Sequence, residues 1–307
     1  ILPPVAFQYP CDPVCTSDYT ILGKLDAVTD DTRETVMSDK QERRNWTREE
    51  TTLALALYLR TPTSQITVTN PNVLMLAKAI NRSAASVKMK LFNLASHDVR
   101  LRDKHLDSLK HGNRMDEEVW NDYMGQDQTK SLDPLFNDLD NIARYFELNL
   151  PFVCRTDIDA PTETIAQIKL RRNQGFFHDT ILSMYQNRCL VTGLSLSPLI
   201  EVAHIVPWSE DAPLRLVPAN GLTLNLLVHR AYDANYLGID PDMNIHVCQE
   251  LMDKSEGKLL ELFKQVNGSR LLLPKNVQPA PEYLELHYVG YLNHEHKGDF
   301  PLIGLHI

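Results

Sequence analysis

The amino-acid sequence predicts an α+β protein, in which a mainly helical N-terminal region precedes a smaller region of strands and helices. Three observations lead to this prediction. Helix start signals followed by apolar residues recur between residues 45 and 100. Between residues 165 and 250, short alternating apolar runs adjoin stretches with helical spacing. The 307 residues are 43% hydrophobic and 23% charged, which is sufficient for two modest hydrophobic cores.

Residues 43–156 are expected to form a helical domain. Asn45 or Thr47 can cap a first helix that ends near Pro62. Asn70 precedes a proline, which is favoured at the first position of a helix, and Ser83 marks a third start. Short helices joined by tight turns are typical of a helix-turn-helix DNA-binding domain.

Basic residues are concentrated in this region, although the formal net charge of the chain is −9. Residues 43–110 carry twelve Lys/Arg against five Asp/Glu, whereas residues 111–168 carry four against twelve. A protein that binds a polyanion needs a local basic region, whatever the net charge of the whole protein. Arg82, Lys88 and Lys90 lie on or beside the third predicted helix, so we expect them to contact DNA. The alternative is a plain three-helix packing domain whose lysines form a solvated face.

The chain outside these helices divides into an arm, a linker and a C-terminal domain. Residues 1–42 show no useful periodicity and carry three basic against eight acidic groups. They are expected to be an acidic arm that is poorly ordered or docks elsewhere. The polar stretch from Asp157 to Thr164 contains a proline and is the expected linker. Residues 165–307 are then the C-terminal domain with an extension.

After a lead-in helix, the C-terminal domain shows a pattern of strand, turn, strand and helix, which is the ββα arrangement. The predicted elements are a lead-in helix over 167–185, strands over 188–192 and 199–205, a helix over 222–234, and a hairpin over 237–247. Four residues stand at informative distances in it: His204, Asn220, His229 and Asp233. His229 and Asp233 are four residues apart on a predicted helix, so they share a face and can bind one divalent cation. His204 lies at a strand end, and an imidazole can take a proton from water near neutral pH.

These residues belong to a longer run of motifs that resembles the HNH endonuclease signature. The motifs, in chain order, are Cys189-Leu-Val-Thr-Gly193, Ile200-Glu-Val-Ala-His204-Ile-Val-Pro-Trp208, Asn220-Gly221-Leu222 and His229-Arg-Ala-Tyr-Asp233. The lead-in Arg172-Asn-Gln-Gly-Phe-Phe177 is similar too. More narrowly, the run resembles the HNH subgroup found in restriction and anti-phage defence proteins. Several motifs in the right order make the resemblance specific.

The resemblance implies a role for each of the four residues. His204 is expected to be the general base, and Asn220 to tie the loop that aims His204. His229 and Asp233 are expected to bind Mg²⁺ or Mn²⁺, with Ni²⁺ or Zn²⁺ as substitutes in vitro. The metal would stabilise charge on the scissile phosphate, and cleavage would leave 5′-phosphate and 3′-hydroxyl ends. Arg215 could contact the phosphate.

The sequence departs from the family pattern at one ligand position. Many HNH proteins have Asp or a second His immediately before the general base, and this chain has Ala203. Two protein ligands remain, which implies a weakly held, water-rich metal. The stretch from Phe176 to Glu250 has eight Asp/Glu against three Lys/Arg, so docking on DNA is expected to depend on the basic segment. No paired C-x-x-C motifs surround it, so no structural zinc is expected.

The favoured interpretation is a restriction or anti-phage endonuclease that cuts double-stranded DNA. One module cuts one strand, so a homodimer would explain double-strand cleavage. The alternatives are a DNA-binding regulator with an inactive HNH module, a nuclease acting on RNA, and a scaffold whose acidic arms bind a partner. No apolar stretch approaches the ~20 residues of a membrane span, and five scattered cysteines form no disulfide framework. We therefore expect a soluble, cytoplasmic protein without a signal peptide.

Overall fold

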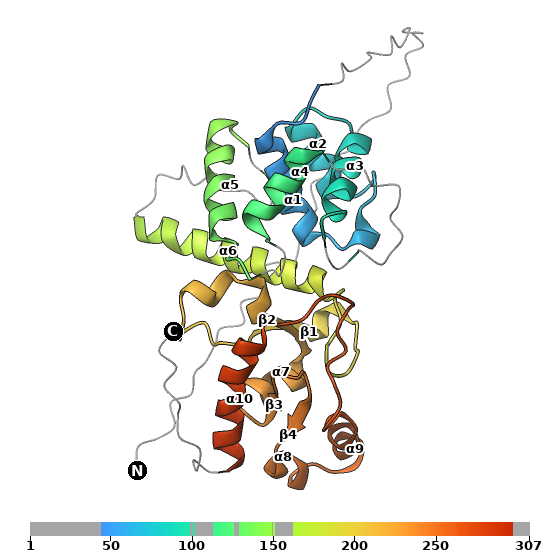
Figure 1. Ribbon diagram of the computed structural model, residues 1–307, viewed down its shortest axis with the longest axis vertical. Helices are drawn as coiled ribbons and strands as arrows, with labels where there is room; N and C mark the ends of the chain where they lie inside the picture. Colours follow the sequence, from blue (N-terminus) through green and yellow to red (C-terminus); the bar gives the residue numbers. More distant parts are fainter. Residues whose placement is uncertain are drawn as a thin grey trace, which may run out of the picture. The chain divides into compact units, whose positions relative to one another are not determined.

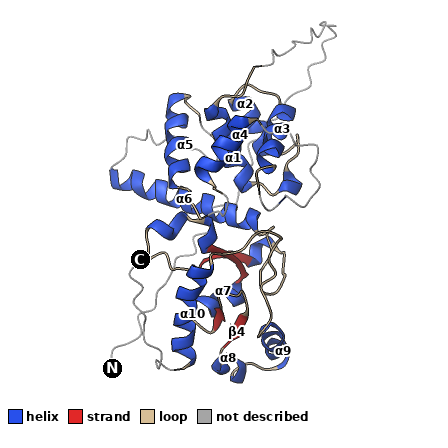
Figure 2. Ribbon diagram, viewed as in Figure 1, coloured by secondary structure: helices blue, strands red, loops and turns tan. Residues whose placement is uncertain are grey.

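The computed structural model describes residues 44–98, 101, 113–125, 129–148, 150 and 162–296. The predicted arm over residues 1–42 and most of the predicted linker from Asp157 to Thr164 lie outside these residues. The described α-helices are α1 (Arg48–Arg60), α2 (Pro71–Ala79), α3 (Ala84–Ala95), α4 (Arg114–Tyr123), α5 (Asp133–Tyr145), α6 (Thr162–Met184), α7 (Leu226–Asp233), α8 (Gln249–Asp253), α9 (Gly257–Val266) and α10 (Pro281–Glu295). The strands are β1 (Ile200–His204), β2 (Gly221–Asn225), β3 (Leu237–Ile239) and β4 (Ile245–Val247). This composition confirms the α+β class, and Figure 2 shows the strands within a largely helical chain.

The first three helices begin where the sequence predicts. Thr47 caps α1 in a capping box, in which its hydroxyl accepts from Glu50 N–H and Glu50 accepts from Thr47 N–H. Asn70 caps α2, which has proline at its first position, and Ser83 caps α3. Each cap satisfies backbone N–H groups that the helix itself leaves unpaired.

Helix α1 is the centre of the helical region. Ten of its residues, from Glu50 to Leu59, are buried, so it is apolar on nearly every side. Helices α2, α3, α4, α5 and α6 all pack against it (Figure 1). Such an all-round apolar helix is stable only inside a layer of other helices.

The C-terminal part contains two small antiparallel sheets. Strand β1 pairs with β2, with Ala203 opposite Leu222 and His204 opposite Gly221. Helix α7 follows β2 directly and packs on both strands, which completes the ββα unit. Strands β3 and β4 form the predicted hairpin after α7, and α10 packs on β3 (Figure 1).

Two details of the predicted ββα unit are wrong. Residues 188–192 form turns and no strand, and the stretch from Leu222 to Asn225, predicted as helical, is strand β2. Leu222 and Leu224 are fully buried, and the Thr223 hydroxyl donates to the carbonyl of Arg188 at 2.6 Å. Burial on both faces hides the alternation that marks a strand, so these residues resemble a buried helical segment.

Helix α6 joins the helical region to the ββα unit. A Cβ atom on Gly221 would lie 2.8 Å from Ile181 Cγ1 and 3.1 Å from Phe177 Cζ, so β2 approaches α6 at a distance that only glycine allows. The Leu132 N–H also donates to the carbonyl of Leu216 at 3.0 Å. The described residues from Asn45 onward accordingly cluster as one compact unit. The functional division at the linker stays a prediction. None of the helices in the described ranges is both long and apolar enough to cross a bilayer.

A half-buried histidine on α10 makes stability depend on pH. The His287 ring stacks on Tyr232, with centroids 3.6 Å apart, and its Nε2–H donates to the Tyr232 carbonyl at 3.1 Å. Burial lowers the pKa of His287 to about 4. The unfolded chain binds this proton near pH 6.5, so stability that is complete at higher pH is lost as the pH falls from about 6.5 toward 4.

We therefore expect His287 to remove about 2 kcal/mol of the free energy of unfolding between pH 8 and pH 5. Urea unfolding of the wild type and of His287→Phe at both pH values measures this contribution. Phenylalanine retains the stacked ring but cannot titrate, so the variant should lose less stability on acidification. An equal loss in both proteins would contradict the assignment.

Candidate active site

His204 stands at the end of β1, where the strand enters the loop that leads to β2. Its Nε2 atom lies 3.0 Å from the backbone carbonyl oxygen of Arg215. A carbonyl oxygen only accepts hydrogen bonds, so Nε2 must carry the proton. In the neutral imidazole this leaves the lone pair on Nδ1, and Nδ1 is the atom that can accept a proton from water.

Aromatic side chains fix the orientation of the His204 ring. Phe177 on α6 stacks against it, with centroids 4.7 Å apart and planes 15° apart. Trp208 meets it edge-on at 5.4 Å. Burial lowers the pKa of His204 below its ordinary value, against a smaller opposing effect of the hydrogen bond to Arg215. The imidazole is therefore neutral at pH 7, which is the form that a general base requires.

Asn220 is fully buried and ties together the loop after β1. Its Oδ1 accepts from the Val206 N–H at 2.8 Å, and its Nδ2 donates to the carbonyls of Val206 and Leu214. This loop also carries the Arg215 carbonyl that orients His204. The contacts of Asn220 are those of a residue that shapes the loop and acts on His204 through it.

His229 and Asp233 lie one turn apart on α7, with His229 Nε2 and Asp233 Oδ2 separated by 3.4 Å. Two atoms at this separation can both lie about 2.1 Å from one divalent cation, so the pair fits a metal. Burial raises the pKa of Asp233 above its ordinary value, and the neighbouring His229 only partly opposes this rise. A bound cation would also oppose the rise, because positive charge favours the ionised carboxylate. Both residues also interact electrostatically with His204, so the fold brings the predicted base and the predicted ligands together.

Glu201 is a further site residue, which the sequence motifs did not single out. Its Oε2 lies 2.6 Å from His229 Nδ1, the ring nitrogen opposite the one that faces Asp233. Among the described residues, no group of three or more His, Cys, Asp or Glu is placed to hold one metal ion. Glu201 contacts a ligand rather than the position between the ligands, which explains why it does not complete such a group. The alternation of β1, which sets Glu201 and Ala203 on one face, is the signal that could have identified it.

Arg215 contributes mainly to the shape of the site. Its Nε donates to the carbonyl of Trp208 at 2.7 Å, and its guanidinium lies 5.1 Å from the centre of the Trp208 ring. The Arg215 carbonyl also accepts the hydrogen bond from His204 Nε2, so Arg215 is held against both Trp208 and His204. Its contact with a phosphate stays a prediction.

The three basic residues predicted to contact DNA have different surroundings. Lys90 is only 3% exposed and forms an ion pair with buried Asp116. Arg82 is similarly enclosed: it pairs with Glu50 at 2.7 Å and lies 4.3 Å from the Trp46 ring centre. These two positive charges are already neutralised by ion pairs inside the helical region, and their contact with DNA stays a prediction. Lys88 is half-buried, with its Nζ 5.8 Å from the Phe92 ring centre, and is the member of the three that still suits a DNA contact.

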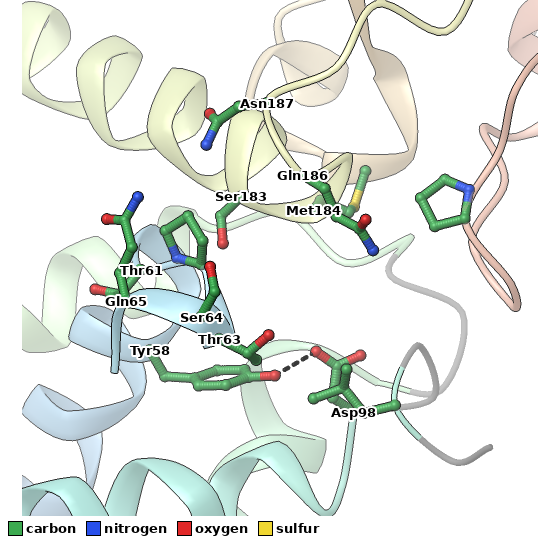
Figure 3. Close-up of a pocket in the computed structure, with 13 residues that line it drawn as sticks. Tyr58, Thr61, Thr63, Ser64, Gln65, Asp98, Ser183, Met184, Gln186 and Asn187 are labelled. Atoms are coloured by element: carbon green, nitrogen blue, oxygen red, sulfur yellow. Dashed lines mark hydrogen bonds between the residues drawn. The ribbon is translucent and has the colours of Figure 1, made fainter. Parts of the chain in front are cut away.

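A cavity of about 330 Å³ lies apart from these residues, near the C-terminal ends of α1 and α6 (Figure 3). Neutral polar groups dominate its lining, and the charged residue in it is Asp98, which accepts from the Tyr58 hydroxyl at 2.6 Å. None of His204, Asn220, His229 and Asp233 lines it. Because the four motif residues lie elsewhere, this cavity is not the candidate active site.

An antiparallel strand pair is followed by a helix, with His204 on the first strand and the His229–Asp233 pair on the helix, which is the ββα arrangement that the sequence motifs predicted. Residues 189–240 match the family model described as HNH endonuclease. This part of the chain is therefore an HNH endonuclease domain, as the sequence motifs predicted, and gives the chain a nuclease module. A search of curated proteins found no match to the chain.

Proposed function

We propose that the protein is a metal-dependent endonuclease that hydrolyses phosphodiester bonds of double-stranded DNA. The observation that carries the proposal is the combination of a neutral His204, with Nδ1 left to accept a proton, and the His229–Asp233 pair next to it. The match to the HNH endonuclease model supports it independently. A cellular role in restriction or antiviral defence rests on the resemblance of the motifs to that subgroup.

The chemistry assigns one task to each side chain. His204 Nδ1 takes a proton from water as the water oxygen attacks phosphorus, and the bond from phosphorus to the 3′ oxygen breaks. The 3′ oxygen takes up a proton from solvent, which leaves a 3′-hydroxyl and a 5′-phosphate. His229 and Asp233 would hold Mg²⁺ or Mn²⁺, which supplies positive charge to the phosphate and the leaving oxygen. Asn220 and Arg215 keep the loop, and through it the His204 ring, in place.

One alternative function has a specific observation behind it. Ala203 stands where many HNH proteins have a further ligand, so a DNA-binding regulator with an inactive module would also fit.

A nuclease acting on RNA shares the same site, because such a site recognises the phosphodiester and not the sugar. Double-strand cleavage by one active site per chain would need two nicks or a homodimer.

Incubation of supercoiled plasmid with the wild type tests the proposal. We expect nicked or linear products with Mg²⁺ or Mn²⁺ and none with EDTA. His229→Ala removes one of the two ligands and should lower the cleavage rate by about 100-fold. His178→Ala, an exposed histidine on α6, is the control and should cleave normally.

A parallel digestion of single- and double-stranded RNA separates the two nuclease hypotheses. Preference for RNA would replace DNA as the substrate. Absence of cleavage on methylated and unmethylated DNA and on RNA would favour the inactive module. Cleavage that is insensitive to EDTA would contradict the metal dependence.

A further inference from the structure

Strand β1 presents two different sets of side chains to the two helices that cover it. His204 contacts Phe177 on α6, whereas Glu201 contacts His229 on α7. Residues two apart on a strand share a face, so Glu201 lies on the same face as Ala203. Ala203 occupies the position at which many HNH proteins carry an additional metal ligand, and it is fully buried. The acidic residue on this face of β1 is therefore Glu201, two residues before the position that carries the additional ligand in many HNH proteins.

The contact between Glu201 and His229 fixes the tautomer of the histidine. A carboxylate oxygen accepts hydrogen bonds, so the 2.6 Å contact places the proton of the neutral imidazole on Nδ1. The lone pair then lies on Nε2, the atom that faces Asp233 Oδ2. A neutral His229 with the opposite tautomer would present an N–H group to a cation and could not bind it.

We propose that Glu201 is a positioning residue that holds His229 ready to bind the metal. This inference rests on the proposed function, because it needs His229 to be a ligand. Carboxylates that hydrogen-bond a metal-binding histidine orient its ring and raise its basicity, and their removal typically weakens metal binding about 10- to 100-fold. With two protein ligands and no third at Ala203, the orientation of each ligand has a larger effect on affinity.

The geometry distinguishes this role from direct coordination. Glu201 reaches the ring nitrogen opposite the one that faces Asp233, so its carboxylate does not share the position between the two ligands. Its side chain is 40% exposed, compared with 15% for His229. Glutamine at this position could still accept the Nδ1–H bond through its amide oxygen, whereas alanine could not.

Isothermal titration of the metal-free protein with Mn²⁺ measures the effect without relying on cleavage. We expect Glu201→Ala to weaken Mn²⁺ binding about 10- to 100-fold, and Glu201→Gln to weaken it only about 3-fold because the hydrogen bond is retained. The matched control is Glu261→Gln on α9, which removes the same charge from a carboxylate that pairs with Lys258. Thermal unfolding of each metal-free variant checks that the fold is intact.

The outcomes separate the inference from the proposed function. Unchanged Mn²⁺ affinity in Glu201→Ala would overturn the inference while leaving the metal site intact. Equal losses in Glu201→Gln and Glu201→Ala would also overturn it, because they would make the charged carboxylate a direct ligand. A wild type that binds no Mn²⁺, or a His229→Ala variant that binds it as tightly as the wild type, would instead overturn the proposed metal site.

Discussion

Replacement of His204 by alanine is expected to lower the rate of DNA cleavage by about 10²- to 10⁴-fold, the usual contribution of a general base. The reason is local and geometric: the Arg215 carbonyl holds the proton on Nε2, and Phe177 and Trp208 hold the ring plane. Alanine removes the proton acceptor but none of the metal ligands. Mn²⁺ binding should therefore stay within a few-fold of the wild type, and single-turnover cleavage measures the chemical step.

The pH dependence of the same reaction provides a second readout. A general base must be neutral, and burial holds the pKa of His204 below its ordinary value. The cleavage rate of the wild type should therefore be nearly flat above pH 6.5 and fall only at lower pH. Residual cleavage by His204→Ala should lack this acid limb. Wild-type rates in His204→Ala would show that another group activates the water.

Loss of the Lys90 charge is expected to have the largest effect on stability. The Lys90 and Asp116 side chains are 3% and 0% exposed, and they form an ion pair with each other. Lys90 Nζ also lies 4.8 Å from the centre of the Trp46 ring, so α3 and the start of the helical region meet at this charge. Lys90→Met leaves a carboxylate buried without its cation, which should lower the free energy of unfolding by about 3–5 kcal/mol. Urea denaturation measures the change.

Two further variants make this second prediction specific. In the double variant with Asp116→Asn, the remaining group is neutral, so at least half of the lost stability should return. Lys88→Met, two residues away on α3 and half-buried, should change stability by less than about 1 kcal/mol and instead weaken DNA binding. A stable Lys90→Met protein with reduced DNA affinity would contradict this prediction and place Lys90 on the DNA-binding surface.

Local signals in the sequence were sufficient for the helical starts and for the motif residues. Thr47, Asn70 and Ser83 cap their helices through side-chain bonds to N–H groups two or three residues away, so the whole interaction is contained in a short segment. His229 and Asp233 share a face because α7 is a helix. The α+β class and the HNH module follow from such patterns, and they required no knowledge of distant contacts.

Tertiary packing decided the features that depend on residues far apart in the chain. Lys90 and Asp116 are 26 positions apart, and Glu201 and His229 are 28 positions apart, so neither pair leaves a periodic signal. A lysine on a helix resembles a solvated or DNA-binding residue until a second helix covers it. Strand β2 is buried on both faces because other segments cover it, so its sequence lacks the alternation of apolar and polar residues that marks a strand. The sequence by itself determined the candidate site residues. Only the tertiary structure decided which charges are buried, which nitrogen of His204 is left without a proton and which carboxylate contacts His229. The physical reason is that burial and long-range hydrogen bonds arise only when distant segments pack.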